Sequence, residues 1–287
     1  MAPTSPTVAC WAIGRRLRER REEAAITGAA AAKRVGVTPA YLSDIEHGKK
    51  NLAEDRLDVL IATYGIEEEE ARELRSLRAS GAHRGWWNAY SALFNSDLLR
   101  FFGFEHGAET VDVFDSDLIN GLFQTEDYAR AVIEAGSPNV RLAEVDRRVK
   151  CRLVRRQRIT GDEPLKLNAV MSEAVLWQRI GGPEVLADQL DHLSALIERY
   201  SDNLAVQVVP FTSTGHDAMG SSAFHIMTFP SGKLPALLWQ ETVTSTGLIS
   251  DPTTVREYGL AHGDALKAAL GRDDSLALIR KVAGQIR

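Results

Sequence analysis

Apolar residues recur at helical spacing through the first 80 residues, and glycines interrupt the pattern. Ile13, Leu17 and Ala24 form one such apolar stripe. An alanine-rich run ends at Gly36, where glycine tolerates the positive φ of a tight turn. The pattern predicts helices over residues 11–25, 29–35, 55–64 and 67–80.

A further short helix is predicted directly after the glycine turn. Thr38 is a good N-cap, and Pro39 suits the first helical position, where its missing N–H has no consequence. Leu42 and Ile45 fall on one face of this helix, and Gly48 ends it. A short helix, a glycine turn and a capped short helix make a helix-turn-helix, whose second helix can enter the major groove of DNA. The alternative is a helical hairpin that serves only in packing.

The pattern changes after Trp86, where aromatic residues become dense and strand candidates appear between turn signals. The strand candidates alternate only partially between apolar and polar residues. Strands alternating with longer helices predict an α+β domain with a four- to five-stranded sheet covered by helices. The expected strands are 110–114, 165–171, 204–209, 223–229 and 236–240, and the expected helices are 125–135, 142–159, 183–200, 253–270 and 274–286.

These elements divide the chain into three parts. Residues 1–9 read as a disordered arm without the features of a secretory signal. Residues 10–80 form the predicted helix-turn-helix domain, and Ser80 to Ala82 is a plausible boundary. Residues 81–287 form the predicted α+β domain, which we expect to act in dimerisation and in effector binding.

Charge is distributed unevenly between these parts. The 287 residues carry a net charge of −5, but residues 1–50 contain nine Lys and Arg against five Asp and Glu. A basic head on an acidic body suits a DNA-binding module attached to a second domain. Two distant cysteines, Cys10 and Cys151, give no disulfide framework and fit a reducing cytosol. We therefore expect a cytoplasmic, nucleoid-associated protein.

The predicted recognition helix is poor in side chains that read bases. Its exposed positions hold no Arg, Lys, Asn or Gln, the usual bidentate partners of guanine and adenine. Two lysines follow the helix and suit phosphate contacts. Readout of each half-site is thin, so we expect a homodimer on a double-stranded operator. The candidate DNA-contacting residues are Gly28, Thr38, Pro39, Ala40, Tyr41, Ser43, Asp44, Lys49 and Lys50.

The second half contains no catalytic signature: no G-x-S-x-G, no Walker loop and no H-E-x-x-H. We therefore expect no enzymatic activity, no cofactor and no metal site. The helix over 142–159 carries many arginines, which favours a solvated face that pairs with the acidic body. The alternatives are an anion-binding surface and a contact with flanking DNA. Candidate effector-pocket residues are Trp87, Gln124, Tyr128, Arg152 and His216, with core packing and capping as the other interpretation of each.

Both halves resemble known families. The head resembles XRE-type, lambda-repressor-like helix-turn-helix regulators. The second half resembles the C-terminal domain of unknown function that follows such heads in actinomycete regulators of the WhiJ-like or antitoxin-like group. The head's match rests on Thr27, Ala32, Gly36, Val37, Thr38, Leu42, Ser43, Ile45, Glu46 and Gly48. The second half's match rests on Gly85-Trp86-Trp87, residues 121–129, Arg147-Arg148-Val149 with Arg152, residues 181–185, residues 206–211, and His216 with Gly220.

The resemblance implies a transcriptional regulator, often encoded beside a small acidic partner protein that modulates repression, and we expect a repressor. It implies that Arg21 pairs with Glu46 and so ties the first helix to the recognition helix. Gly28 stands where the family often has a phosphate-binding glutamine, so that side-chain contact is missing here. Phe123 replaces the second leucine of the family's Leu-Leu-Gln-Thr, which is a conservative change. The alternative function is an antitoxin-like module that mainly sequesters the small partner, with autorepression secondary.

Overall fold

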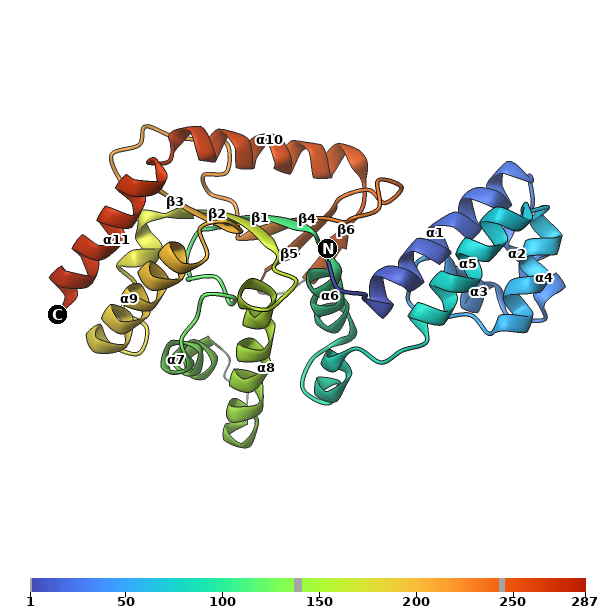
Figure 1. Ribbon diagram of the computed structural model, residues 1–287, viewed down its shortest axis with the longest axis horizontal. Helices are drawn as coiled ribbons and strands as arrows, with labels where there is room; N and C mark the ends of the chain where they lie inside the picture. Colours follow the sequence, from blue (N-terminus) through green and yellow to red (C-terminus); the bar gives the residue numbers. More distant parts are fainter. Residues whose placement is uncertain (1, 137–140, 243–245) are drawn as a thin grey trace. The chain divides into compact units, whose positions relative to one another are not determined.

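The computed structural model describes residues 2–136, 141–242 and 246–287, and the chain forms two compact units. The first unit spans Pro3–Ala89, and the second contains Tyr90–Arg287 (Figure 1). No helix among the described residues combines the length and the apolar character needed to cross a membrane.

The first unit is entirely helical, and its helices begin at polar caps and stop at glycines. Thr27 and Thr38 accept hydrogen bonds from the main-chain N–H groups of the first turns that follow them. Gly36 and Gly65 end two helices in the left-handed conformation. The helices are α1 (Pro6–Glu23), α2 (Gly28–Val35), α3 (Pro39–Glu46), α4 (Glu54–Tyr64) and α5 (Glu68–Gly81), followed by a 3-10 turn at Trp86–Tyr90.

The expectation of a disordered arm over residues 1–9 needs correction. Residue 1 lies outside the described residues, but α1 begins at Pro6, well before the expected start at residue 11. The Ser5 side chain accepts from the Val8 N–H, and Pro6 occupies the first helical position. Because the helix has a capped start at Pro6, residues 6–9 belong to α1 and not to a disordered arm. The division between compact units falls after Ala89, whereas the sequence places it near residue 80.

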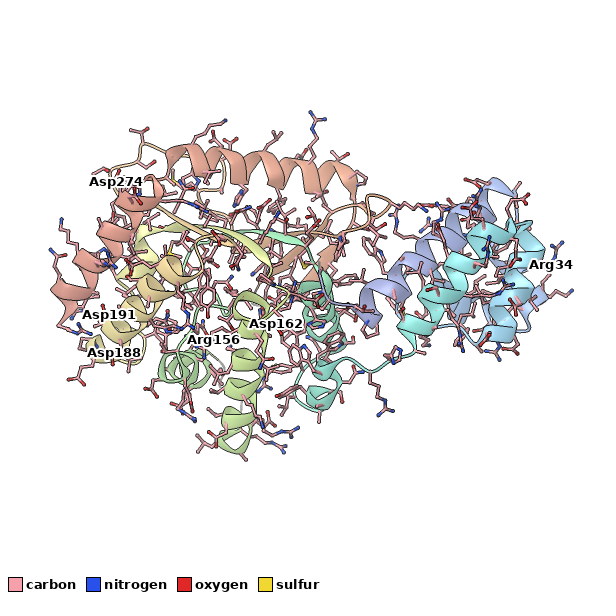
Figure 2. All side chains as sticks on the ribbon, in the orientation of Figure 1. Arg34, Arg156, Asp162, Asp188, Asp191 and Asp274 are labelled. Carbon is pink, nitrogen blue, oxygen red and sulfur yellow. The ribbon has the colours of Figure 1, made fainter. Side chains whose placement is uncertain are left out.

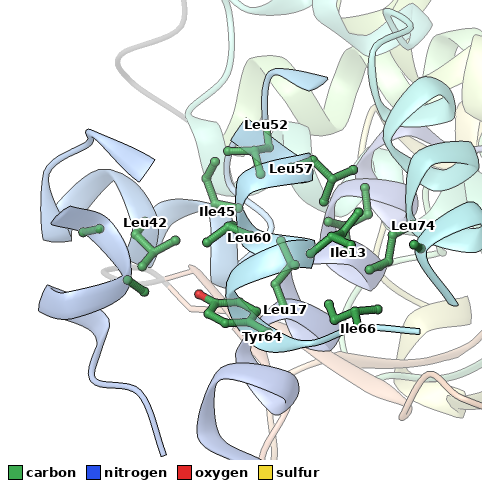
Figure 3. Close-up of a cluster of buried hydrophobic side chains, with 14 residues drawn as sticks. Ile13, Leu17, Leu42, Ile45, Leu52, Leu57, Leu60, Tyr64, Ile66 and Leu74 are labelled. Atoms are coloured by element: carbon green, nitrogen blue, oxygen red, sulfur yellow. The ribbon is translucent and has the colours of Figure 1, made fainter. Parts of the chain in front are cut away.

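Leucines from several helices meet in the core of the first unit. Leu17 of α1 and Leu57 and Leu60 of α4 are fully buried (Figure 3). Leu42 and Ile45 turn the inner face of α3 into the same cluster. Burial of this face fixes α3 in the unit and leaves its opposite face toward solvent.

The second unit is built on a six-stranded mixed sheet in the order β3-β2-β1-β4-β5-β6. β1, β2 and β3 are parallel to one another, while β4, β5 and β6 continue from β1 in antiparallel pairs. Val113 of β1 pairs with Ala169 on one side and with His225 on the other. The strands are β1 (Thr110–Asp115), β2 (Lys166–Ser172), β3 (Leu204–Val209), β4 (Phe224–Thr228), β5 (Leu237–Glu241) and β6 (Thr246–Ile249).

Helices cover both faces of this sheet, with α10 on one face and α6 to α9 on the other (Figure 1). α10 packs on Phe224, Ile226 and Leu238. α11 packs on α9 and on β3 at the edge of the sheet. The helices are α6 (Ser96–Gly107), α7 (Glu126–Gly136), α8 (Leu142–Thr160), α9 (Pro183–Arg199), α10 (Pro252–Ala268) and α11 (Arg272–Ile286), with a 3-10 turn at Glu173–Leu176.

The α+β prediction is confirmed, and two elements were missed. The sheet gains a sixth strand, β6, at its edge. Helix α6 occupies the aromatic-dense segment, capped by Asn95 and buried through Phe101, Phe102 and Phe104. Because apolar residues stand at three of four successive positions, α6 has no narrow amphipathic stripe for a sequence pattern to detect.

We expect Gly14→Ala to destabilise the first unit, because α1 crosses α3 at this glycine. A Cβ at position 14 would collide with the main-chain carbonyl of Ile45 and lie 2.9 Å from that of Glu46. Main-chain atoms cannot move aside as a flexible side chain can, so we expect a loss of about 2–3 kcal/mol. Urea unfolding of the full chain measures it. Gly28→Ala is the matched control, since its Cβ meets nothing within 4 Å, and it should be neutral or slightly stabilising. Equal effects of the two changes would contradict the close approach.

Candidate functional site

The outer face of α3 is open within the first unit. Thr38, Pro39, Ala40 and Ser43 are exposed, while Leu42 on the opposite face is buried. The Thr38 hydroxyl accepts from the Tyr41 N–H at 3.1 Å, which starts the helix cleanly at the exposed end. The N-terminal half of α3 is therefore presented to solvent, as the major groove requires of a recognition helix.

A cluster of charge surrounds Tyr41 on this face. Lys50 forms a 2.8 Å ion pair with Asp44, and this bond lowers the pKa of the Asp44 carboxyl. The Lys50 ammonium also lies 5.2 Å from the centre of the Tyr41 ring, and the Arg56 guanidinium lies 5.7 Å from it. The Lys50 ammonium therefore offsets the negative charge of Asp44, and the repulsion between Asp44 and DNA phosphates is reduced.

Two contacts on this face were not predicted from the sequence. Asp44 and Lys50, both predicted to contact DNA, pair with each other in the free protein. Arg56, at the third position of α4, joins the surface around Tyr41. Gly28 opens α2 and is partly buried, while Lys49 is exposed. Arg34, in the last turn of α2, also extends from the surface of this unit (Figure 2).

Arg21 and Glu46 meet in a bidentate pair between α1 and α3. The Arg21 Nε donates to Glu46 Oε1 at 2.6 Å, and Nη2 donates to Oε2 at 2.9 Å. A third donor, Nη1, reaches the Ile26 carbonyl at 3.0 Å. Both side chains are largely buried, and burial, followed by the Glu46 charge, raises the pKa of the nearby Tyr64 hydroxyl to about 12. The pair fixes the end of the recognition helix against α1.

The expectation that the arginines of α8 form a solvated face is wrong for two of them. Arg155 is buried, and its Nε and Nη2 donate to the Glu105 carboxylate at 2.8 and 2.7 Å. Arg158 is also buried and donates to the main-chain carbonyls of Glu163 and Ala108. These contacts cross from α8 to α6 and to the segments that flank β1 and β2. They therefore serve packing inside the second unit.

Three of the five predicted effector-pocket residues come together. The Arg152 guanidinium donates to Gln124 Oε1 at 2.6 Å, and Gln124 Nε2 donates to the Ile119 carbonyl at 2.7 Å. Tyr128 is fully buried, and its hydroxyl lies 3.5 Å from the Ile119 N–H. These residues join α8 to the loop that follows β1.

The other two predicted pocket residues take no part in these contacts. Trp87 belongs to the first unit, where it is buried with its ring edge-on to Trp86. His216 packs edge-on to Phe114, which points into the core beneath α10. Neighbouring residues of a strand point to opposite faces, so Phe114 and Asp115 face different layers. His216 is therefore on the face of the sheet opposite to α8.

A buried chain of polar side chains, not predicted from the sequence, lies at the carboxyl end of β1. Asn120 Nδ2 lies 3.1 Å from His225 Nε2 and 3.5 Å from Asp115 Oδ1. Burial raises the pKa of Asp115 to about 8, and burial lowers the pKa of His225 to about 4. Asp115 Oδ2 and His225 Nδ1 have no hydrogen-bond partner among the described residues. Both groups are therefore neutral at pH 7. No sequence motif links them, because β4 follows β1 by more than a hundred residues.

Two family models match the chain. The model described as "Domain of unknown function (DUF5753)" matches residues 98–281, and a model of a helix-turn-helix domain matches residues 12–74. No curated protein and no solved structure gives a significant match. The predicted order, a helix-turn-helix head followed by a domain of unknown function, is confirmed. Groups of three or more His, Cys, Asp or Glu that could hold a metal are absent from the described residues.

We expect Asp115→Asn to change how stability depends on pH. The pKa of Asp115 rises from 3.8 to about 8 on folding, so the folded state keeps a proton that the unfolded state loses. This contribution is complete below pH 4 and is lost as pH rises through 8. Relative to the wild type, the variant should gain about 2 kcal/mol between pH 6.5 and 8. Urea unfolding at both pH values measures the difference. Parallel curves for the two proteins would show that Asp115 titrates in its ordinary range.

Proposed function

The chain belongs to the DUF5753 family and carries a helix-turn-helix domain ahead of the family domain, and from this we propose that it is a dimeric, operator-binding repressor. The helix-turn-helix makes it a DNA-binding regulator. The second unit is proposed to dimerise and to sense a small ligand or a small acidic partner protein. The XRE and WhiJ-like resemblance supports the repressor role.

One observation carries the proposal: α3 is exposed on its outer face and fixed on its inner face. Leu42 and Ile45 bury the inner face, and Arg21 holds Glu46 at the end of the helix. A recognition helix needs such support because base contacts gain specificity only when the side chains are held in register.

The side chains on α3 argue for binding as a dimer. Ala40 and Tyr41 can contact a thymine methyl group, and Ser43 can bond to either a donor or an acceptor. None of these is a bidentate reader, and Asp44 is engaged by Lys50. One copy therefore supplies few specific contacts. Two copies on half-sites about one helical turn apart double those contacts on a single DNA molecule.

Titration of the full chain against DNA from upstream of its own gene tests the proposal. A shift that prefers this sequence at moderate salt supports it. A symmetric operator should bind much more tightly than the same DNA with one half-site scrambled. Nanomolar binding of a monomer to a single half-site would contradict the dimer. Co-purification of a small protein without any operator binding would instead favour the partner-sequestering role.

We expect Lys49→Ala to weaken operator binding about equally for all sequences, because the proposal assigns Lys49 a phosphate contact. Lys49 is exposed just after α3. Removing one phosphate contact lowers the slope of log K against log salt concentration by about 1. Fluorescence anisotropy across a salt series measures the slope. Lys281→Ala, an equal charge change on the exposed face of α11, is the control and should leave the slope unchanged. An unchanged slope for Lys49→Ala would remove this residue from the interface.

A further inference from the structure

Two arginines of α8 converge on one glutamine. Arg152 Nη1 donates to the side-chain oxygen of Gln124 at 2.6 Å, and Arg156 Nη1 lies 3.5 Å from its main-chain oxygen. Arg156 also donates to His192 Nε2 of α9 at 3.2 Å, so the His192 ring accepts and is neutral. Arg156 lies where α8 faces α7 and α9 (Figure 2). Two positive charges thus surround a neutral side chain.

Neither of these arginines has a carboxylate partner in the part of the chain that the structure describes. No Asp or Glu oxygen among the described residues lies within 4.0 Å of either guanidinium, whereas Arg148 and Arg155 on the same helix have Glu144 and Glu105. Glu241 attracts Arg152 only at longer range. Arg152 and Arg156 therefore differ in kind from the paired arginines beside them.

The surroundings make the missing counter-charge costly. Burial, followed by the charge of Arg155, lowers the pKa of Arg152 to about 10, so the group remains protonated at neutral pH. Burial and the charge of Arg156 also lower the pKa of His192. A desolvated cation is destabilising unless an anion or several hydrogen-bond acceptors offset the loss of water.

The geometry of Arg152 leaves a recognition edge unused. Arg155 and Arg21 each turn their Nε and Nη2 donors to the two oxygens of a carboxylate. Arg152 uses Nη1 for Gln124, and its Nε and Nη2 have no acceptor among the described residues. This edge of a guanidinium matches the paired oxygens of a carboxylate or a phosphate. Arg152 as a whole residue is intermediate between buried and exposed, so its side chain keeps some contact with solvent.

We propose that Arg152, with Arg156 beside it, binds a small oxyanionic ligand through a carboxylate or phosphate group. The ligand's oxygens would take the unused Nε and Nη2 edge of Arg152, and Arg156 would add a second positive charge. Gln124 holds the guanidinium in place, and Gln124 is in turn held by the Ile119 carbonyl. A small oxyanion bound here would be the ligand that the second unit senses, and this regulatory role of the site rests on the proposed function.

Thermal unfolding of the full chain tests the site, with sodium phosphate and sodium acetate compared against sodium chloride at equal ionic strength. At about ten times its Kd, a bound ligand should raise Tm by roughly 3–6 °C. Arg152→Gln should abolish the rise, and Arg156→Gln should reduce it. Lys150→Gln removes an equal charge from the exposed face of α8 and should keep the full rise. A rise of the same size in all three variants, or no rise with either oxyanion, would overturn the proposal. A response to phosphate alone, or to acetate alone, identifies which group the site takes.

A loss of folding would not imitate this result. Without any oxyanion, Arg152→Gln should leave Tm unchanged or raise it, because it removes a desolvated charge and keeps a donor for Gln124. Arg155→Gln should lower Tm, because it leaves Glu105 buried without its partner. A fall in the Tm of Arg152→Gln equal to that of Arg155→Gln would show a structural role and refute the site.

Operator titration separates this inference from the proposed function. If Arg152→Gln and the wild type both bind operator DNA but neither responds to oxyanions, the anion site fails and the regulator role stands. If oxyanions raise Tm through Arg152 but no variant binds operator DNA, the site stands and the regulator role fails.

Discussion

Each unit depends on a largely or fully buried arginine that binds a glutamate of another helix through its Nε and Nη2 donors. Arg21 joins α1 to Glu46 at the end of α3, and Arg155 joins α8 to Glu105 of α6. A bidentate pair fixes two helices in distance and in rotation, which apolar contacts alone do less strictly. Removing either member would leave a buried charge without compensation, so each pair is a single structural unit.

The first unit could be read from the sequence because its signals are local. A threonine cap, a proline at the first helical position and a glycine stop act within a few residues, so Thr38, Pro39 and Gly36 marked the helix-turn-helix correctly. Leu42 and Ile45 were placed on the buried face by spacing alone. The neutralisation of Asp44 by Lys50 could not be read in this way, because it depends on how the chain turns after α3.

The second unit was predicted only in outline, because its decisive contacts join distant segments. The α+β class followed from the alternation of elements, but β6 is a four-residue edge strand with little pattern. The Asp115–Asn120–His225 chain depends on β1 pairing with β4, and the Gln124–Arg152 contact depends on α8 crossing the loop after β1. His216 was also predicted for the pocket, but the alternation of side chains along β1 places it on the opposite face of the sheet from Arg152.

The loop between β1 and α7 ties these features together. It contains Asn120, which contacts Asp115 and His225, and, near its end, Gln124, which accepts a hydrogen bond from the Arg152 guanidinium. Two neutral buried side chains, Asp115 and His225, hold the start of this loop. The Arg152 cation, which has no carboxylate partner among the described residues, holds its end. Packing alone would be served better by an apolar residue at position 152, since a desolvated charge lowers stability. The proposed anion would offset this charge, and the loop would then link the anion to the carboxyl end of the parallel strands, where α/β sheets commonly bind their ligands.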